Sequence, residues 1–221
     1  GNGFIVSRAA LGFAVAEGGH YPGTYLAGGY DRAVTEIQGR EIENEDLVNL
    51  PNWLPLTFGI DGGPWVRPAT VRHLEHVRRL DLRDGILSLR LRVADAEGRV
   101  TRLEERRLVS MHQPQLAALE LRITPENWSG TLTLRAALDG SVVNAGVARY
   151  RELEGRHLET LATGAPDGVV WLRSRMRQSR LEVGLAARLS VAAAGAVGTR
   201  RVEHLADLVV EEFDVDARAG E

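Results

Sequence analysis

The densest group of acidic side chains in the sequence is a run of four carboxylates: Glu41, Glu43, Glu45 and Asp46. A pair of carboxylates held several ångströms apart is the usual acid and base of glycoside cleavage. On a strand, the three glutamates would share one face, because successive side chains alternate between faces. Glu104 and Glu105 form a second, smaller group. Since Glu and Asp are usually exposed, both groups are predicted to be solvated strand faces, and the sequence identifies no acid–base pair.

Histidine spacing offers a weak metal signal. His73 and His76 lie three residues apart, and on a helix both would face the same way. A zinc site needs a third ligand and usually a recognisable motif, and the sequence shows neither. We therefore predict no metal site and assign both side chains to surface or packing roles. The remaining histidines are isolated along the chain: His20, His112, His157 and His204.

Aromatic and amide side chains gather in the first third of the chain. Trp and Tyr rings can cover the apolar faces of sugars while their polar edges reach hydroxyl groups. Four residues of this region are candidates for a pocket rim or a domain interface: Tyr25, Asn49, Asn52 and Trp53. Tyr21 and Tyr30 lie close to them in sequence. The alternative is that these rings pack a loop onto the rest of the fold or onto another domain.

The residue types that the sequence lacks exclude several kinds of chemistry. It has no cysteine, which excludes disulfides, thiolate metal ligands and a cysteine nucleophile. All 27 basic residues are arginine, and without lysine neither a P-loop nor a Schiff-base enzyme is built. A Gly-x-Ser-x-Gly motif, which would mark a hydrolase nucleophile, is missing too. The sequence predicts no cofactor.

Charge and hydropathy predict a chain without nucleic-acid or membrane partners. The net charge is −3, and the basic clusters are only pairs, predicted to be solvated: Arg78-Arg79, Arg106-Arg107 and Arg200-Arg201. The longest apolar stretch, 185–197, contains Arg188 and is too short to span a bilayer. No basic region precedes an apolar run at the start, so we expect no secretory signal and a cytoplasmic protein.

The elements that must position these groups are predicted to be strands. Apolar and polar side chains alternate over four stretches, which places one face of each on a core: 87–93, 119–123, 132–138 and 181–191. No stretch has a long apolar stripe at helical spacing. We therefore predict an all-β fold of antiparallel sheets, with residues 1–221 in one domain.

Glycine-containing pairs separate these stretches and predict turns with positive φ: Asp84-Gly85, Glu97-Gly98, Ser129-Gly130, Asp139-Gly140, Glu154-Gly155 and Asp167-Gly168. Their regular recurrence is typical of an antiparallel sandwich. Prolines interrupt any long element in residues 1–68, so short strands joined by structured loops are expected there. The tail, 214–221, is expected to fray.

Seven strings, taken together and in order, resemble one known family. The most specific is Asn49-Leu50-Pro51-Asn52-Trp53-Leu54-Pro55, and the strings occupy residues 1–4, 20–28, 45–55, 80–85, 107–111, 125–130 and 139–144. They resemble the N-terminal domain of glycoside hydrolase family 65, which includes maltose, trehalose and kojibiose phosphorylases and related hydrolases. The resemblance is strong from residue 1 to about residue 160 and weaker beyond.

The resemblance implies a large antiparallel β-super-sandwich that precedes an (α/α)6 barrel. In the family the barrel carries the general acid and the phosphate site, so no catalytic residue is implied in this sequence. The chain shows no long amphipathic helices and is expected to be a fragment of a longer enzyme. The implied reaction is inverting phosphorolysis or hydrolysis of maltose-, trehalose- or kojibiose-like disaccharides, with inorganic phosphate as co-substrate of a phosphorylase.

The partners implied by the resemblance are the chain's own catalytic barrel, the disaccharide and a second copy in a homodimer. The chain would then be an accessory domain that supports the barrel and shapes one rim of its pocket, with the loop 49–55 facing the barrel. Two alternatives stay open on the residues alone. One is a free-standing carbohydrate-binding module that holds sugar through Tyr25 or Trp53, and the other is a structural interaction domain without a ligand.

Overall fold

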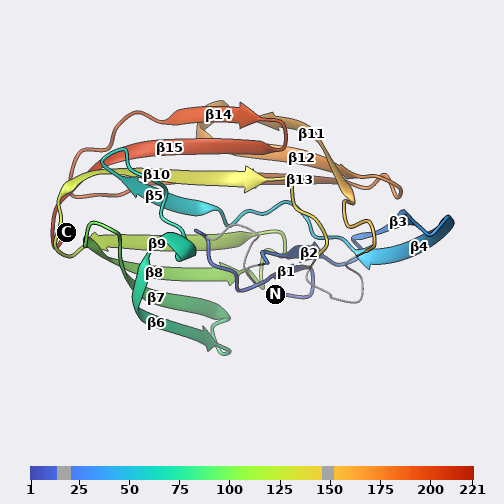
Figure 1. The fold of residues 1–221 in the computed structure, drawn as a ribbon, viewed down its shortest axis with the longest axis horizontal. Coiled ribbons are helices and arrows are strands. Elements are labelled where there is room, and N and C mark those ends of the chain that lie inside the picture. The colour runs from blue at the N-terminus through green and yellow to red at the C-terminus, as the bar shows by residue number, and fades with distance from the viewer. Residues whose placement is uncertain (14–20, 146–151) are drawn as a thin grey trace.

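The structure, a computed structural model, describes residues 1–13, 21–145 and 152–221 and is built almost entirely from β-strands (Figure 1). The strands are β1 (Ile5–Ser7), β2 (Thr24–Leu26), β3 (Tyr30–Ile37), β4 (Arg40–Leu47), β5 (Leu56–Ile60), β6 (Arg72–Asp81), β7 (Ile86–Ala94), β8 (Val100–Val109), β9 (Ala117–Pro125), β10 (Gly130–Asp139), β11 (Leu158–Gly164), β12 (Val170–Met176), β13 (Glu182–Ala187), β14 (Arg201–Leu205) and β15 (Leu208–Ala217). Helical structure in the described residues is limited to the 3-10 turns η1 (Pro68–Thr70) and η3 (Pro166–Gly168).

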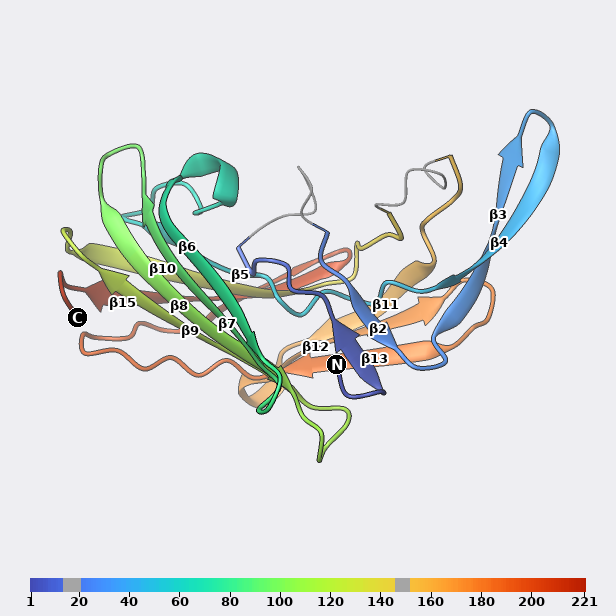
Figure 2. The same cartoon turned by 90° about the horizontal axis from the view of Figure 1, so that it is seen from below.

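The strands form two facing four-stranded sheets with smaller sheets beside them. The sheet β6-β7-β8-β9 faces the sheet β14-β15-β10-β5 (Figure 1). The three-stranded sheet β11-β12-β13 and the pairs β1-β2 and β3-β4 complete the described fold. The hairpin β3-β4 projects away from the other strands (Figure 2). All these pairings are antiparallel, so the predicted all-β antiparallel sandwich is confirmed.

The main hydrophobic core lies between the two four-stranded sheets. Leu91 of β7 and the facing Phe58 and Leu132 of β5 and β10 belong to one buried cluster. Trp128 lies in the same cluster and donates its indole N–H to Thr101 Oγ1 at 3.0 Å, so its polar edge is satisfied inside the core. The apolar positions of the predicted alternation therefore point inward.

Two smaller clusters attach the remaining strands. One contains Val48, Leu50, Leu158 and Met176, and the other contains Leu138, Val170, Leu172 and Val209. The first joins the end of β4 to β11 and β12, and the second joins β12 to the sheet of β10 and β15. The three-stranded sheet is thus held by side-chain packing rather than by strand pairing.

The alternation over 181–191 predicts a longer strand than the fold contains. β13 ends at Ala187, which pairs with Val170, the first residue of β12. The chain beyond Ala187 has therefore run past the end of its partner strand, and it leaves the sheet. It returns only at a single bridge between Val197 and Val215 of β15.

The expected fraying of 214–221 is wrong for the first half of this tail. β15 runs to Ala217, which pairs with Gly130, the first residue of β10. Val215 points into the fold and is buried, and Thr133 Oγ1 donates to Asp214 Oδ1 at 2.8 Å. A partner strand of matching length holds this segment in place.

Glycine has two different roles at the predicted turns. Positive φ is found at Gly85, Gly98 and Gly168. The same prediction is wrong at Gly130, Gly140 and Gly155, where a close approach excludes a side chain. A Cβ added at Gly140, for example, would lie 2.6 Å from Thr160 Oγ1. At those three positions packing, rather than backbone conformation, requires glycine.

Candidate functional site

Asn49 joins three segments that the sequence strings had singled out separately. Its side-chain Oδ1 accepts the backbone N–H of Thr24 at 3.0 Å, and its Nδ2 donates to the carbonyls of Pro22 and Val143 at 3.1 and 3.2 Å. Asn144 Oδ1 in turn accepts the backbone N–H of Asn49 at 2.8 Å. We call this meeting point of residues 21–26, 47–50 and 143–145 the junction. Asn49 is only 2% exposed, so its amide holds the junction together and faces no solvent.

Asn52 is also buried and fastens the loop 49–55 to the end of β10. Its Oδ1 accepts the backbone N–H of Leu54 at 3.1 Å. Its backbone exchanges hydrogen bonds of 2.7 and 3.0 Å with Asp139. Both asparagines of the loop therefore set the path of the backbone, because both amide atoms of Asn49 and Oδ1 of Asn52 are hydrogen-bonded inside the fold.

Tyr25 and Tyr21 form the aromatic side of the junction. The Arg8 guanidinium carbon lies 4.9 Å from the centre of the Tyr21 ring, a cation–π distance. Tyr21 Oη donates to the carbonyl of Val143 and accepts the N–H of Ala145, both at 3.1 Å. Burial and the hydrogen bond with Tyr21 raise the pKa of Tyr25 to about 12, so this phenol stays protonated and is not a general base at neutral pH.

Trp53 lies away from the tyrosines, in a different packing cluster. It is half-buried against the group that contains Leu138 and Val209. The four rim candidates are therefore split by the fold. Tyr25 and Asn49 belong to the junction, whereas Asn52 and Trp53 cover the end of β10. Only the two aromatic residues keep part of their surface exposed.

The acidic run lies on the projecting hairpin, with its three glutamates exposed as predicted. Arg32 of β3 contacts Glu43 at 3.3 Å and Glu45 at 3.0 Å across the hairpin. Glu41 pairs in register with Glu36. The glutamates are thus neutralised in part by arginine on an open surface, an arrangement that suits a solvated face and offers no enclosed cleft for an acid and a base.

Predicted exposure is wrong for Glu105 and Arg107, which are 4% and 6% exposed. The Arg107 Nε contacts Glu105 Oε1 at 2.7 Å, and its Nη2 donates to the carbonyl of Ala10 at 2.6 Å. Arg200, which was also predicted to be solvated, is half-buried, and its Nε lies 2.8 Å from Oε2 of the buried Glu211. Alternation along β8 turns Glu105 and Arg107 to the inner face, where each charge is tolerated because the other neutralises it.

A buried histidine is the feature that sequence reasoning missed. His157, only 2% exposed, lies between two carboxylates, with Nδ1 3.3 Å from Asp31 Oδ2 and Nε2 3.2 Å from Asp46 Oδ2. Asp31 Oδ1 also accepts the backbone N–H groups of Gln178 and Ser179. No local motif marks His157 in the sequence, because both carboxylates come from the distant hairpin.

Hydrogen bonds set the charge state of Asp31. Burial by itself raises the pKa of this carboxyl, but the hydrogen bonds from Ser179 and His157 outweigh it and hold the pKa below its usual value. Asp31 is therefore ionised at neutral pH. The group ties the base of the hairpin β3-β4 to β11 and to the turn after β12.

The other histidines in the described part of the chain form no ligand set. His73 and His76 lie on a strand rather than a helix, and a bulge between His73 and Glu75 turns both rings to one face, with centroids 6.2 Å apart. Within the described ranges, no three His, Asp or Glu side chains are placed to hold a metal ion. His20 lies outside the described residues. The described part of the chain also contains no helix with the length and hydropathy of a membrane span.

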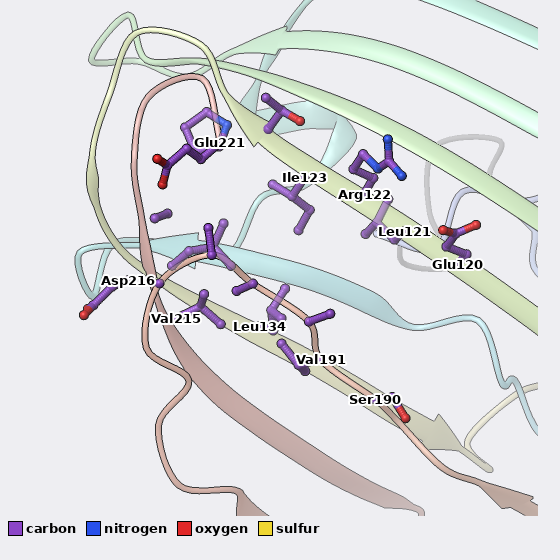
Figure 3. Close-up of a pocket in the computed structure, with 18 of the residues that line it drawn as sticks. Glu120, Leu121, Arg122, Ile123, Leu134, Ser190, Val191, Val215, Asp216 and Glu221 are labelled. Atoms are coloured by element: carbon purple, nitrogen blue, oxygen red, sulfur yellow. The ribbon is translucent and has the colours of Figure 1, made fainter.

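A groove of about 670 Å³ opens between β9 and the paired strands β10 and β15 (Figure 3). Leu121 and Ile123 of β9 lie opposite Leu134 and Val215, and Val191 of the segment after β13 closes one side. Charged and polar side chains of β9, β15 and the segment after β13 also line the groove, so its walls are mixed rather than purely aliphatic.

Comparisons with known proteins find one family and several of its members. A family model described as glycosyl hydrolase family 65, N-terminal domain, matches residues 1–221. An uncharacterized glycosyl hydrolase of Mycobacterium tuberculosis is 45% identical over 188 residues, which cover 85% of this chain and 14% of that protein. A kojibiose phosphorylase of Caldanaerobacter subterraneus is 30% identical over 160 residues, 72% of this chain and 19% of the relative.

A trehalose 6-phosphate phosphorylase of Lactococcus lactis is 29% identical over 188 residues, which cover 85% of this chain and 23% of that protein. The chain thus spans less than a quarter of the length of each of these three relatives.

Proposed function

This chain belongs to the N-terminal domain family of glycosyl hydrolase family 65, and from that premise we propose that it is the accessory β-domain of an enzyme that cleaves α-linked glucose disaccharides. The substrates proposed are maltose-, trehalose- or kojibiose-like, and the reaction is inverting phosphorolysis or hydrolysis. Relatives named as phosphorylases of kojibiose and trehalose 6-phosphate support this class. We also propose that the enzyme is cytoplasmic.

The observation that carries the proposal is the placement of the carboxylates. An inverting enzyme needs an acid on one side of the glycosidic bond and room for the nucleophile on the other. The acidic run lies on an open hairpin with Arg32 between two of its members, and the buried carboxylates Glu105 and Glu211 are occupied by arginine. We therefore assign the acid and the site of the co-substrate phosphate to a catalytic (α/α)6 domain outside this chain.

In this proposal the junction supports the catalytic domain and shapes one rim of its pocket. The hydrogen bonds of Asn49 and Asn52 make the loop 49–55 rigid, and rigid loops are where scaffolds place recognition residues. Tyr25 and Trp53 are half-buried, so part of each residue remains accessible. They are the residues through which the domain would contact the catalytic domain or the sugar.

We expect purified residues 1–221 to turn over no disaccharide. Unaided glycosidic bonds break very slowly, so measurable turnover needs a positioned acid and an activated nucleophile. The assay offers maltose, trehalose, kojibiose, nigerose and trehalose 6-phosphate, each with and without phosphate, and measures glucose and glucose 1-phosphate. The native-length protein is the positive control. Turnover by residues 1–221 that disappears in a Glu41→Gln, Glu43→Gln, Glu45→Gln variant would place the active site on the hairpin instead.

Replacing Trp53 in the native-length enzyme is expected to lower activity per folded molecule. Trp53→Ala removes an aromatic surface, for which we expect a loss in kcat/KM on the order of tenfold. Trp53→Phe keeps most of the packing against Leu138 and Val209 and should lose less. Trp65→Phe is the matched control, because Trp65 is also half-buried but stacks on Arg135 at 5.2 Å. A lowered melting temperature with unchanged activity per folded molecule would make Trp53 a packing residue only.

A further inference from the structure

The free edge of β6 is the most exposed strand edge in the described fold. Nine of its ten residues, Arg72 to Leu80, are exposed, and β6 pairs on one side only, with β7. Figures 1 and 2 both show no described strand beyond it. The opposite edge of the same sheet, β9, differs, because the segment 188–195 lies across its groove. A long open edge presents unpaired N–H and C=O groups that can accept another strand.

The outer face of β6 carries apolar and charged side chains in a symmetric order. Register with β7 places Glu75, Val77 and Arg79 on one face, opposite Arg92, Arg90 and Ser88. Val77, which is 51% exposed, therefore lies between an acid and a base at equal spacing. Such an order is complementary to itself when the strand is reversed.

Of the registers centred on His76, Val77 or Arg78, only the one centred on Val77 places opposite charges across from each other. In an antiparallel pair of identical strands related by a two-fold axis, opposed residues share a face. Centring the axis on Val77 places Glu75 of each copy opposite Arg79 of the other. Centring it on Arg78 sets Arg78 against itself and Glu75 against Asp81, and centring it on His76 leaves Glu75 opposite Val77. Opposite charges across strands stabilise a pair, and like charges destabilise it.

The inner face is compatible with the same register. On this face, the register centred on Val77 places His76 of each copy opposite Arg78 of the other, as the alternation along β6 requires. Burial, Arg78 and His73 lower the pKa of His76, so the imidazole is neutral at neutral pH and this contact is not a like-charge pair.

We propose that β6 is an interface for a second copy of this chain: two β6 edges pair antiparallel about Val77, with reciprocal Glu75–Arg79 contacts, and join two four-stranded sheets into one. The partner is a second copy because the charge order of this edge is complementary to its own reverse. The interface lies apart from the junction and does not depend on the proposed function.

Disulfide trapping tests the register directly: residues 1–221 contain no cysteine, so each variant adds one cysteine to this domain, and the native-length parent protein oxidised in parallel is the control. Opposed Cα atoms of an antiparallel pair lie about 4.5–5.5 Å apart, within the range of a disulfide. In the native-length protein, Val77→Cys should form a covalent dimer under mild oxidation. Glu75→Cys and Arg79→Cys should not, because each residue lies four positions, about 13 Å, from its own copy along the strands. Trypsin cleaves after Arg72 and Arg78, so mass spectrometry identifies the linked 73–78 peptides.

Charge reversal provides a second, independent measurement by sedimentation velocity. Arg79→Glu creates two like-charge contacts and should weaken the dimer about tenfold. Adding Glu75→Arg to that variant restores both contacts and should restore the dimer. Arg122→Glu, on the exposed face of the other edge strand β9, is the control and should change nothing. A wild-type protein that stays monomeric, or trapping at Val77 no faster than at Glu75, overturns the proposal and makes β6 an edge protected by its charges and its bulge.

Discussion

Replacing Glu105 with alanine should destabilise the fold by about 3–5 kcal/mol, because it leaves a buried guanidinium without a counter-charge. Arg107 is 6% exposed, and its remaining partners are the neutral carbonyls of Arg8 and Ala10. A desolvated cation held only by carbonyl dipoles costs far more free energy than a hydrated one. The measurement is the free energy of unfolding from urea denaturation of the variant and the wild type.

The neighbouring Glu104 is the matched control for this prediction. It points to the opposite face of β8, is half-exposed, and contacts Arg90 at 3.3 Å. Loss of an exposed ion pair costs about 1 kcal/mol or less, so Glu104→Ala should be nearly silent. The paired change Glu105→Leu with Arg107→Met removes both buried charges and should recover most of the lost stability. Equal losses of unfolding free energy in Glu104→Ala and Glu105→Ala would contradict the argument from burial.

Asp31→Ala should have the second largest effect, a loss of about 3 kcal/mol. The substitution removes the acceptor of three groups: the N–H groups of Gln178 and Ser179 and the Nδ1 of His157. Each buried polar group left without a partner costs about 1–3 kcal/mol, and partial access of water to the turn reduces the sum. Glu43→Ala, on the exposed face of the same hairpin, is the control. A loss no larger than that of Glu43→Ala would refute the role of this buried contact.

The contribution of Asp31 should also depend on pH in a defined direction. The pKa of Asp31 is lower in the folded protein than its usual value, so the folded state favours the ionised form. Its stabilisation is complete above the unfolded pKa, about 3.9, and is lost as the pH falls through the lower folded pKa. The difference in unfolding free energy between wild type and Asp31→Ala should therefore be constant from pH 7 to about 5 and shrink below about 4. If this difference in unfolding free energy instead grew as the pH fell, the folded state would favour the protonated carboxyl, and the prediction would be wrong.

Local pattern was sufficient for the strands and for the family. Alternation at 87–93, 119–123 and 132–138 predicted β7, β9 and β10, because the two-residue period of a strand is written in adjacent residues. The same local rule failed at 188–191, since the end of β13 depends on where its partner β12 begins. Strand pairing is a property of two segments, and only one of them is visible in a sequence window.

The candidate site divides in the same way. The strings at 20–28, 45–55 and 139–144 stood out in the sequence, but only the tertiary structure brought them together at Asn49. It also turned Asn49 and Asn52 inward, which the composition of the loop did not reveal.

The amino-acid order was enough to predict the strand pattern, the family and the chemistry excluded by missing residue types. Which charged side chains are buried follows from the three-dimensional arrangement alone. Glu104 and Glu105 are adjacent and chemically identical, yet one faces water and the other a buried arginine. His157 is isolated in sequence and meets Asp31 across 126 positions. The free energy of a charge depends on its surroundings rather than on its neighbours in the chain, and folding assembles those surroundings from distant segments.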